Sequence, residues 1–225
     1  MTKLQSFVRL DFVTVKPYFT GKNLLVYAAV AVFLTTTSGN IASGLGVGAM
    51  LGTMFASYPF AVGEKCNMDA LYATLSVDRK TVVLGRYVFA MLFNVLAILC
   101  SVILASAGLL ISQTTRSADS AGDTLLAIVL IAALFAVIQA IQLPIYFRYG
   151  YSKAKFFSMM PFAAIMVSYT MFTIIGKDSG LSGKVNEIFS GLNGGGLIAL
   201  IVFIVFLALL VSYSLSLSFY QKREF

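Results

Sequence analysis

The chain has 225 residues, of which 59% are hydrophobic and only 11% are charged. A water-soluble domain is about half apolar and about a quarter charged, so this composition predicts a protein of the lipid bilayer. The chain contains no His and carries a formal net charge of +7. Without histidine it cannot build a Ser-His-Asp triad, an HExxH zinc site or a histidine proton relay. The two cysteines, Cys66 and Cys100, form no CxxC pair, which argues against a disulfide or zinc framework.

The first 20 residues have the pattern of an amphipathic helix. The apolar residues recur near helical spacing, at Leu4, Phe7, Val8, Phe12 and Val15. Polar residues occupy the other faces, at Lys3, Gln5, Arg9 and Lys16. Such a helix lies along the membrane interface, and Pro17 is expected to end or bend it. A solvated basic tail is the alternative.

Six stretches free of Asp, Glu, Lys and Arg follow, and crossing the hydrocarbon layer takes about 20 mostly apolar residues in a helix. They cover approximately residues 23–40, 42–62, 87–111, 125–147, 156–176 and 197–219. The first is the weakest, because its far end is the polar run from Thr35 to Asn40. The sequence therefore predicts an all-α integral membrane protein with six transmembrane helices, formed by a single domain over residues 1–225.

The distribution of charge predicts the orientation. Cytoplasmic loops carry an excess of Lys and Arg. With the N-terminus inside, only Arg116, Lys177 and Lys184 of the 16 Lys and Arg residues lie outside. Both termini are therefore expected in the cytoplasm. The positive charge then reflects topology beside anionic lipid headgroups, and no nucleic-acid partner is expected.

The cytoplasmic connection over residues 63–86 carries a second amphipathic pattern. Asn67 is suited to cap a short helix there, with Asp69 turned away from its apolar face. The apolar residues follow the i, i+3, i+4, i+7 spacing, at Met68, Leu71, Tyr72 and Leu75. We expect this helix to have only lipid or a partner protein to pack on. Asp78 is then expected to start the helix of the third span.

No Asp, Glu, Lys or Arg lies within the predicted spans, although charged residues there mark sites where ions or protons are handled. The polar side chains there are hydroxyls and amides, and the amides include Asn94 in the third span and Gln139 and Gln142 on one face of the fourth. They line a polar path or bond across helices, and we favour the second interpretation. Small residues recur every four positions in the second span, at Asn40, Gly44, Gly48, Gly52 and Ala56. This stripe allows close helix packing, either within one subunit or between subunits.

Two cytoplasmic runs resemble a known family. The runs from Glu64 to Tyr87 and from Leu143 to Lys155 are similar to two loops of bacterial type-2 ABC exporter permeases, between spans two and three and between spans four and five. The amphipathic N-terminus and the six-span plan match as well, so the resemblance covers nearly the whole chain. Within the family, the chain is most similar to small permeases that export antimicrobial or cytolytic peptides such as phenol-soluble modulins, or that confer peptide-antibiotic resistance.

The resemblance implies a transmembrane subunit in the bacterial plasma membrane that exports amphipathic or antimicrobial peptides or similar hydrophobic compounds. Two permease subunits, identical or paralogous, would meet around the path, with an ABC ATPase subunit docked below each. ATP and Mg²⁺ would be bound by the ATPase and not by this chain. The coupling helix would contain Asn67, Met68, Asp69, Leu71, Tyr72 and Leu75. A second cytoplasmic contact would be formed by Arg148, Lys153 and Lys155.

The alternative is a non-transporting membrane accessory or immunity protein, which would act without any ATPase. No GxxxxGK[ST] run occurs in the chain, so it does not bind ATP in the P-loop manner. The absence of histidine and of paired acids within the spans argues against an intramembrane enzyme. We therefore expect no enzymatic activity from this chain.

Overall fold

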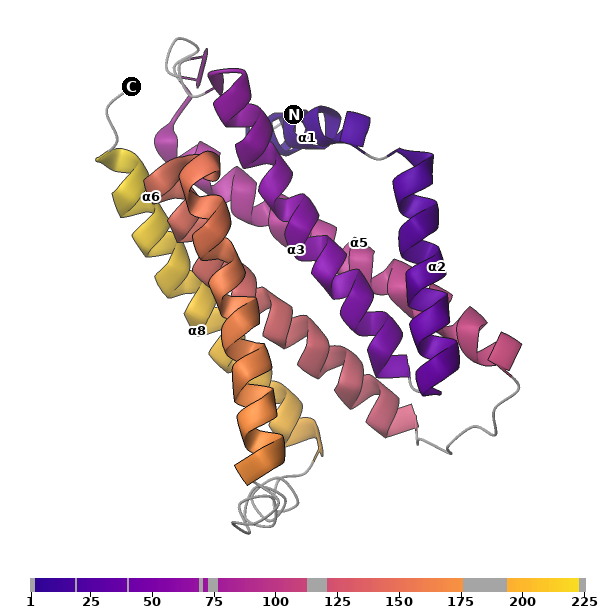
Figure 1. The fold of residues 1–225 in the computed structure, drawn as a ribbon. Coiled ribbons are helices and arrows are strands. Elements are labelled where there is room, and N and C mark those ends of the chain that lie inside the picture. The colour runs from indigo at the N-terminus through magenta and orange to yellow at the C-terminus, as the bar shows by residue number, and fades with distance from the viewer. Residues whose placement is uncertain are drawn as a thin grey trace.

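The computed structural model describes residues 3–18, 20–39, 41–68, 71–72, 77–112, 121–175 and 194–222. All regular secondary structure within these ranges is helical, which confirms the predicted all-α class (Figure 1). The elements are α1 (Lys3–Val15), the short 3-10 helix η1 (Lys16–Tyr18), α2 (Gly21–Ser38), α3 (Ile41–Lys65), α5 (Arg79–Ser112), α6 (Ala121–Ile175) and α8 (Gly194–Gln221).

Four helical stretches are long and apolar enough to cross a membrane: Ile41–Lys65, Arg79–Ile111, Thr124–Phe157 and Gly195–Gln221. A fifth candidate arises only if Leu4–Tyr18 and Gly21–Ser38 are taken together, and these two helices are bent by 84°. α2 is short, and it carries Lys22 at one end and the polar run from Thr35 to Ser38 at the other. The structure thus contains four to five candidate spans, compared with six predicted, although helical residues occupy each of the six predicted ranges.

α6 is two helices joined at one residue. Gly150 has φ 74° and ψ 173°, a backbone conformation that residues with a Cβ rarely adopt. The chain reverses there, so the second half of α6 returns alongside the first (Figure 1), and the rings of Phe135 and Phe162 are 6.2 Å apart. The connection predicted between the fourth and fifth spans is therefore not an open loop, because helix continues on both sides of a glycine hinge.

The small-residue stripe brings α3 close to α5 and α2 within one chain. A Cβ on Gly44 or Gly48 would overlap Thr35 or Ser101, respectively. One on Gly52 would lie 2.9 Å from Asn94 Oδ1. Close packing inside the subunit therefore accounts for these three glycines. Asn40, the first member of the stripe, lies outside the described residues.

The largest buried cluster lies where α1, α3, α5, α6 and α8 meet (Figure 1). Its fully buried members come from all five helices and the segment after α3: Phe7, Ala56, Tyr72, Val82, Val83, Tyr87, Ala90, Leu143, Phe147 and Tyr220. We call the region around this cluster the junction, and define it as residues 3–18, 60–68, 71–72, 77–87, 143–155 and 212–222.

Candidate functional site

α1 is docked onto α5 along one face. Phe7 and Val15 are buried, and the rings of Phe12 and Phe89 lie 4.8 Å apart. A Cβ on Gly85 would overlap the Phe7 ring, so this glycine forms the notch that receives the phenyl group. The predicted N-terminal helix is confirmed as a helix, and it gives way to η1 at Lys16, next to Pro17. Its position at a membrane interface stays a prediction.

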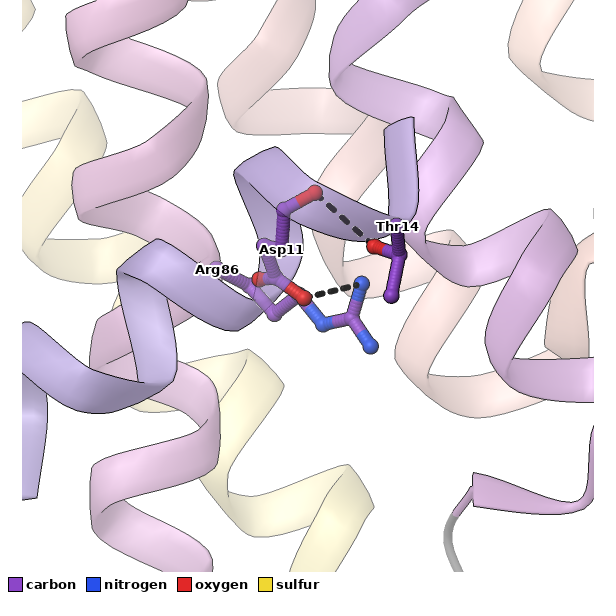
Figure 2. Close-up of polar contacts among 3 residues, drawn as sticks. All are labelled: Asp11, Thr14 and Arg86. Carbon is purple, nitrogen blue, oxygen red and sulfur yellow. Dashed lines mark hydrogen bonds and ion pairs between the residues drawn. The ribbon is translucent and has the colours of Figure 1, made fainter. Parts of the chain in front are cut away.

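A buried ion pair fixes α1 to the start of α5 (Figure 2). Asp11 Oδ1 lies 3.3 Å from Arg86 Nη1, and both side chains are at most 5% exposed. The Arg86 guanidinium also lies over two aromatic rings, 4.9 Å from the centroid of Phe60 and 5.8 Å from that of Phe7. Thr14 Oγ1 donates a hydrogen bond to the Asp11 carbonyl at 2.8 Å. The guanidinium is therefore held between a carboxylate and two ring faces.

Burial raises the pKa of Asp11 from 3.8 to about 6, although the nearby Arg86 charge lowers it. Removal from water disfavours a carboxylate, and one neighbouring cation offsets that cost only in part. Asp11 Oδ2 has no hydrogen-bond partner in the protein. One of the two carboxylate oxygens therefore has no hydrogen bond to offset its loss of hydration. The pair is thus sensitive to the protonation of Asp11.

Sequence reasoning overlooked this pair, but the sequence contains a signal for it. Asp11 follows Leu4, Phe7 and Val8 at helical spacing, so its carboxylate falls within the apolar stripe of α1. A lone charge in such a stripe is buried with the stripe and needs a partner. Arg86 was assigned only to the cytoplasmic excess of positive charge.

Asn67 lies in the turn between α3 and the helical residue Met68, and its backbone differs from the extended conformation usual for an N-cap. Its φ is 49°, in the left-handed region that asparagine tolerates after a helix C-terminus. Its N–H donates to the Glu64 carbonyl at 3.5 Å, and its carbonyl accepts from the Leu71 N–H at 3.4 Å. Asn67 therefore lies at the predicted N-cap position, since its carbonyl accepts the first backbone bond of the segment that follows. A capping bond from its side chain stays a prediction.

The segment after Asn67 packs against its own chain, which corrects the expectation that only lipid or a partner would cover it. Met68, Leu71 and Tyr72 are helical. Tyr72 is 5% exposed, with its ring 5.2 Å from that of Phe7, and Met68 packs against the same cluster. Leu71 does not belong to this cluster and is 46% exposed. Asp69 and Leu75 lie outside the described residues.

The three basic residues predicted as a second contact flank the Gly150 hinge. Arg148, Lys153 and Lys155 are exposed, and the Arg148 guanidinium lies 5.0 Å from the ring centroid of Phe219. The Glu64 carboxylate accepts a hydrogen bond from the Ser152 N–H at 3.0 Å. The end of α3 is therefore tied to the helix that starts after the hinge.

The start of α5 also holds the end of α8. Arg79 Nη1 donates to the Tyr220 carbonyl at 3.3 Å and to the Gln221 carbonyl, which are among the carbonyls left unpaired at a helix C-terminus. Deeper in, the Tyr87 hydroxyl lies 2.5 Å from Ser212 Oγ and 2.7 Å from Ser216 Oγ. These contacts join the two helices over three turns of α8.

The amides of the predicted spans are buried within the bundle. Asn94, Gln139 and Gln142 are at most 5% exposed. Asn94 Oδ1 and both polar atoms of the Gln139 amide have no hydrogen-bond partner in the protein. The cross-helix bonds that we favoured are thus missing at these atoms, and a role along a path stays a prediction.

Positive charge collects at one end of the bundle. Every Lys and Arg in the described part of the chain belongs to the junction or to the first turn of α2, which starts at the same end (Figure 1). Within the same residues, no three His, Cys, Asp or Glu side chains come together as a possible metal site.

Apolar helices of membrane-spanning length, with their charges gathered at one end, define a multi-pass membrane protein. Residues 6–221 match the model of a family described as ABC-2 family transporter protein. Because the match covers nearly the whole chain, the chain belongs to this family, whose members are membrane components of ABC transporters and are not themselves catalytic. Membership implies partnership with an ABC ATPase subunit. Comparison with curated proteins and with solved structures gives no match.

Proposed function

We propose that this chain is the permease subunit of an ABC exporter in the bacterial plasma membrane, with six transmembrane helices and both termini in the cytoplasm. Family membership supports the transport role. The gathering of Lys and Arg at the junction supports the orientation, because cytoplasmic ends of membrane helices are enriched in these residues.

The junction is the part of the permease on which the ATPase acts. The observation that carries this proposal is a continuous set of contacts from the surface to α5. Leu71 is exposed beside buried Tyr72, Tyr72 packs on Phe7, and Phe7 packs on Arg86. A push on the segment around Leu71 would therefore move α1 and the start of α5 together.

The complete exporter contains two permease subunits and two ATPase subunits, and ATP and Mg²⁺ are bound by the ATPases. Its cargo is an amphipathic peptide or a similar hydrophobic compound. An apolar groove of about 370 Å³ between α2, α3 and α5 supports a hydrophobic cargo. Side chains from all three helices line it, among them Tyr27, Leu51, Phe93 and Leu96.

The first test is co-purification of the tagged chain from its native membrane in mild detergent, followed by mass spectrometry and an ATPase assay. We expect an ABC ATPase to be recovered near one-to-one. Leu71→Glu places a charge on the exposed docking residue and should reduce this recovery at least tenfold without affecting membrane insertion.

Val13→Glu is the matched control. Val13 is 60% exposed and lies on α1, on the same face as Arg9 and Lys16, so an added carboxylate there should leave ATPase recovery unchanged. Recovery of the chain without any ATPase would overturn the proposal and favour a non-transporting accessory or immunity protein.

A further inference from the structure

A second groove, between α1 and α5, shares the Phe12 side chain with the apolar groove of α2, α3 and α5. It has a volume of about 410 Å³. Its apolar walls come from both helices, at Leu4, Val8, Phe12, Val88 and Leu92. Arg9 is the one charged side chain among the described residues that line it. The groove is therefore an apolar surface with a single positive charge.

The charge of Arg9 is open to a ligand. The Arg9 side chain is exposed, and it forms an ion pair with no carboxylate in the described part of the chain. Asp11, two residues further along α1, is buried on another side of the helix against Arg86. A guanidinium presents two parallel N–H donors, which match the geometry of a phosphate group.

The attitude of α1 suits contact with lipid headgroups. α1 lies across the end of the bundle at which positive charge collects (Figure 1). Leu4–Tyr18 is bent by 84° from Gly21–Ser38, so α1 runs nearly at a right angle to α2. An amphipathic helix in this attitude matches the plane of the headgroups, which would place Arg9 at the level of the phosphates.

The apolar wall of the groove continues along α5. Leu92 is 46% exposed, and exposed apolar side chains follow it at helical spacing, at Val95, Leu96, Leu99 and Ile103. All of them lie within the candidate span Arg79–Ile111. An acyl chain that begins beside α1 can therefore lie along α5 through the hydrocarbon layer.

We propose that the groove between α1 and α5 binds an anionic phospholipid, with its phosphate at Arg9 and one acyl chain against Val88 and Leu92. Charge complementarity supports this occupant, because anionic headgroups are attracted to basic residues at the membrane surface. The walls come from two helices, so the bound lipid stabilises α1 on α5. The site goes beyond the proposed export function and requires only that the chain lies in a bilayer.

The test uses tryptophan fluorescence, because the chain contains no Trp and a single introduced Trp reports on one position. Leu92→Trp places the reporter in the groove. Leu210→Trp is the control on α8, at a side chain of similar exposure, 49%, that lines neither groove. The full chain is placed in phosphatidylcholine nanodiscs with increasing fractions of brominated phosphatidylglycerol or brominated phosphatidylcholine, which quench a Trp that they contact.

The expected result is a preference for the anionic lipid at the groove alone. Brominated phosphatidylglycerol should bind beside Leu92→Trp about fivefold more tightly than brominated phosphatidylcholine, as expected for one basic residue beside an anionic lipid. At Leu210→Trp the two lipids should bind equally. The same ratio at both reporters would overturn the proposal, since it would reflect a general attraction of anionic lipid to the chain.

Matched variants of basic residues locate the headgroup. Combined with Leu92→Trp, Arg9→Gln should remove the preference for phosphatidylglycerol, whereas Arg9→Lys should keep it, because lysine retains the charge. Lys22→Gln should also keep it, since Lys22 is exposed in the first turn of α2 and does not line the groove. Loss of the preference in Lys22→Gln, or its survival in Arg9→Gln, would contradict the assignment.

Cover of the groove by protein is the remaining alternative. If neither brominated lipid quenches Leu92→Trp while both quench Leu210→Trp, a second copy of the chain or a partner protein occupies the groove, and the proposal is overturned. The assay requires no ATPase. Its failure therefore leaves the proposed function standing, and failure of ATPase co-purification leaves the lipid site standing.

Discussion

At the junction, five helices meet in one buried cluster, whereas at the opposite end α2 and the last turns of α5 lie apart from α8 and from the second half of α6 (Figure 1). Arg86 and Asp11 are at most 5% exposed at the junction, while Leu110 and Ile111 near the far end of α5 are 76% and 69% exposed. The junction is held together by the chain itself. The far half depends on lipid, or on a second subunit, to cover its apolar surface.

This difference suits a subunit that is driven from one end. A tightly packed region transmits displacement, because close-packed interiors resist compression. Loosely associated helices with exposed apolar faces can separate at little cost once lipid replaces the lost contacts. Matched substitutions at the two ends test whether the stability of the chain is concentrated at the junction.

The largest effect is expected at the buried ion pair. Asp11→Leu leaves the Arg86 guanidinium buried without a counter-ion, and a guanidinium cannot lose its proton in a protein. We expect a loss of about 3–5 kcal/mol of stability at pH 7, measured by thermal unfolding in detergent. Arg86→Met should cost less, because the Asp11 carboxyl already has a pKa of about 6 and takes up a proton readily.

Two comparisons sharpen this prediction. The double variant with Asp11→Leu and Arg86→Met should recover most of the lost stability, since replacing both charges with apolar groups removes the uncompensated one. Leu110→Ala, in the exposed far half, should change the unfolding temperature very little. Equal losses for Asp11→Leu and Leu110→Ala would contradict the concentration of stability at the junction.

The next effect is expected at the α3–α5 contact. Gly48→Ala introduces a Cβ that overlaps Ser101, and overpacking of this kind costs about 1–3 kcal/mol. Gly46→Ala is the matched control, because nothing lies within 4 Å of a Cβ at that position. Thermal unfolding of both variants should show a loss for the first alone; a loss of the same size in both would point to helix propensity or lipid contacts.

The pH dependence of stability should carry the signature of Asp11. Its pKa in the folded chain is raised from 3.8 to about 6 by burial, so the folded state binds the proton more tightly than the unfolded state does. Its contribution to stability is therefore fully present below pH 4 and is lost as the pH rises towards 6, by at most about 1.4 kcal/mol per pH unit. Above pH 7 no further loss from this group is expected.

The measurement is the difference in unfolding free energy between the wild type and Asp11→Asn from pH 4 to pH 8. The wild type should become relatively less stable between pH 4 and 6, with a constant difference above pH 7. A difference that stays constant over the whole range would show that Asp11 titrates as it does in the unfolded chain.

The smallest effect is expected at Tyr87. Tyr87→Phe removes the hydroxyl that lies beside Ser212 and Ser216, while Ser212 keeps its hydrogen bond to the Ala140 carbonyl at 2.6 Å. A hydrogen bond of this kind contributes about 0.5–1.5 kcal/mol. Thermal unfolding of Tyr87→Phe should show that loss, and Tyr149→Phe, at an exposed position, should show none.

The features predicted correctly are those that local pattern determines. Helical residues occupy each stretch free of charges, and α1 gives way to η1 beside Pro17, because apolar length and proline act within a few residues. The start of α5 was also correct: the Thr81 and Val82 N–H groups bond to the Asp78 carbonyl at 2.9 and 3.2 Å.

The features that were missed depend on contacts between distant parts of the chain. An amphipathic pattern predicts that Tyr72 packs against an apolar surface, but it does not show whether α1 or a partner protein provides that surface. The charges near Gly150 indicated a connection between two spans, but not that helix continues on both sides of this glycine. That feature depends on the backbone angles of Gly150, which its neighbours in the sequence do not determine. Asp11 was readable from its place in the apolar stripe, but Arg86 as its partner was not, because 75 residues separate them in the chain.

We propose that an ABC ATPase docks on the junction at Leu71. This docking is tested most directly by cysteine cross-linking in native membranes, with Cys66 and Cys100 replaced by Ser because both are exposed. Leu71→Cys should cross-link to an ABC ATPase through a short bifunctional reagent, and Leu110→Cys, at the far end of α5, should not. Absence of any ATPase cross-link from Leu71→Cys, in a preparation from which the ATPase still co-purifies, would contradict docking at the junction.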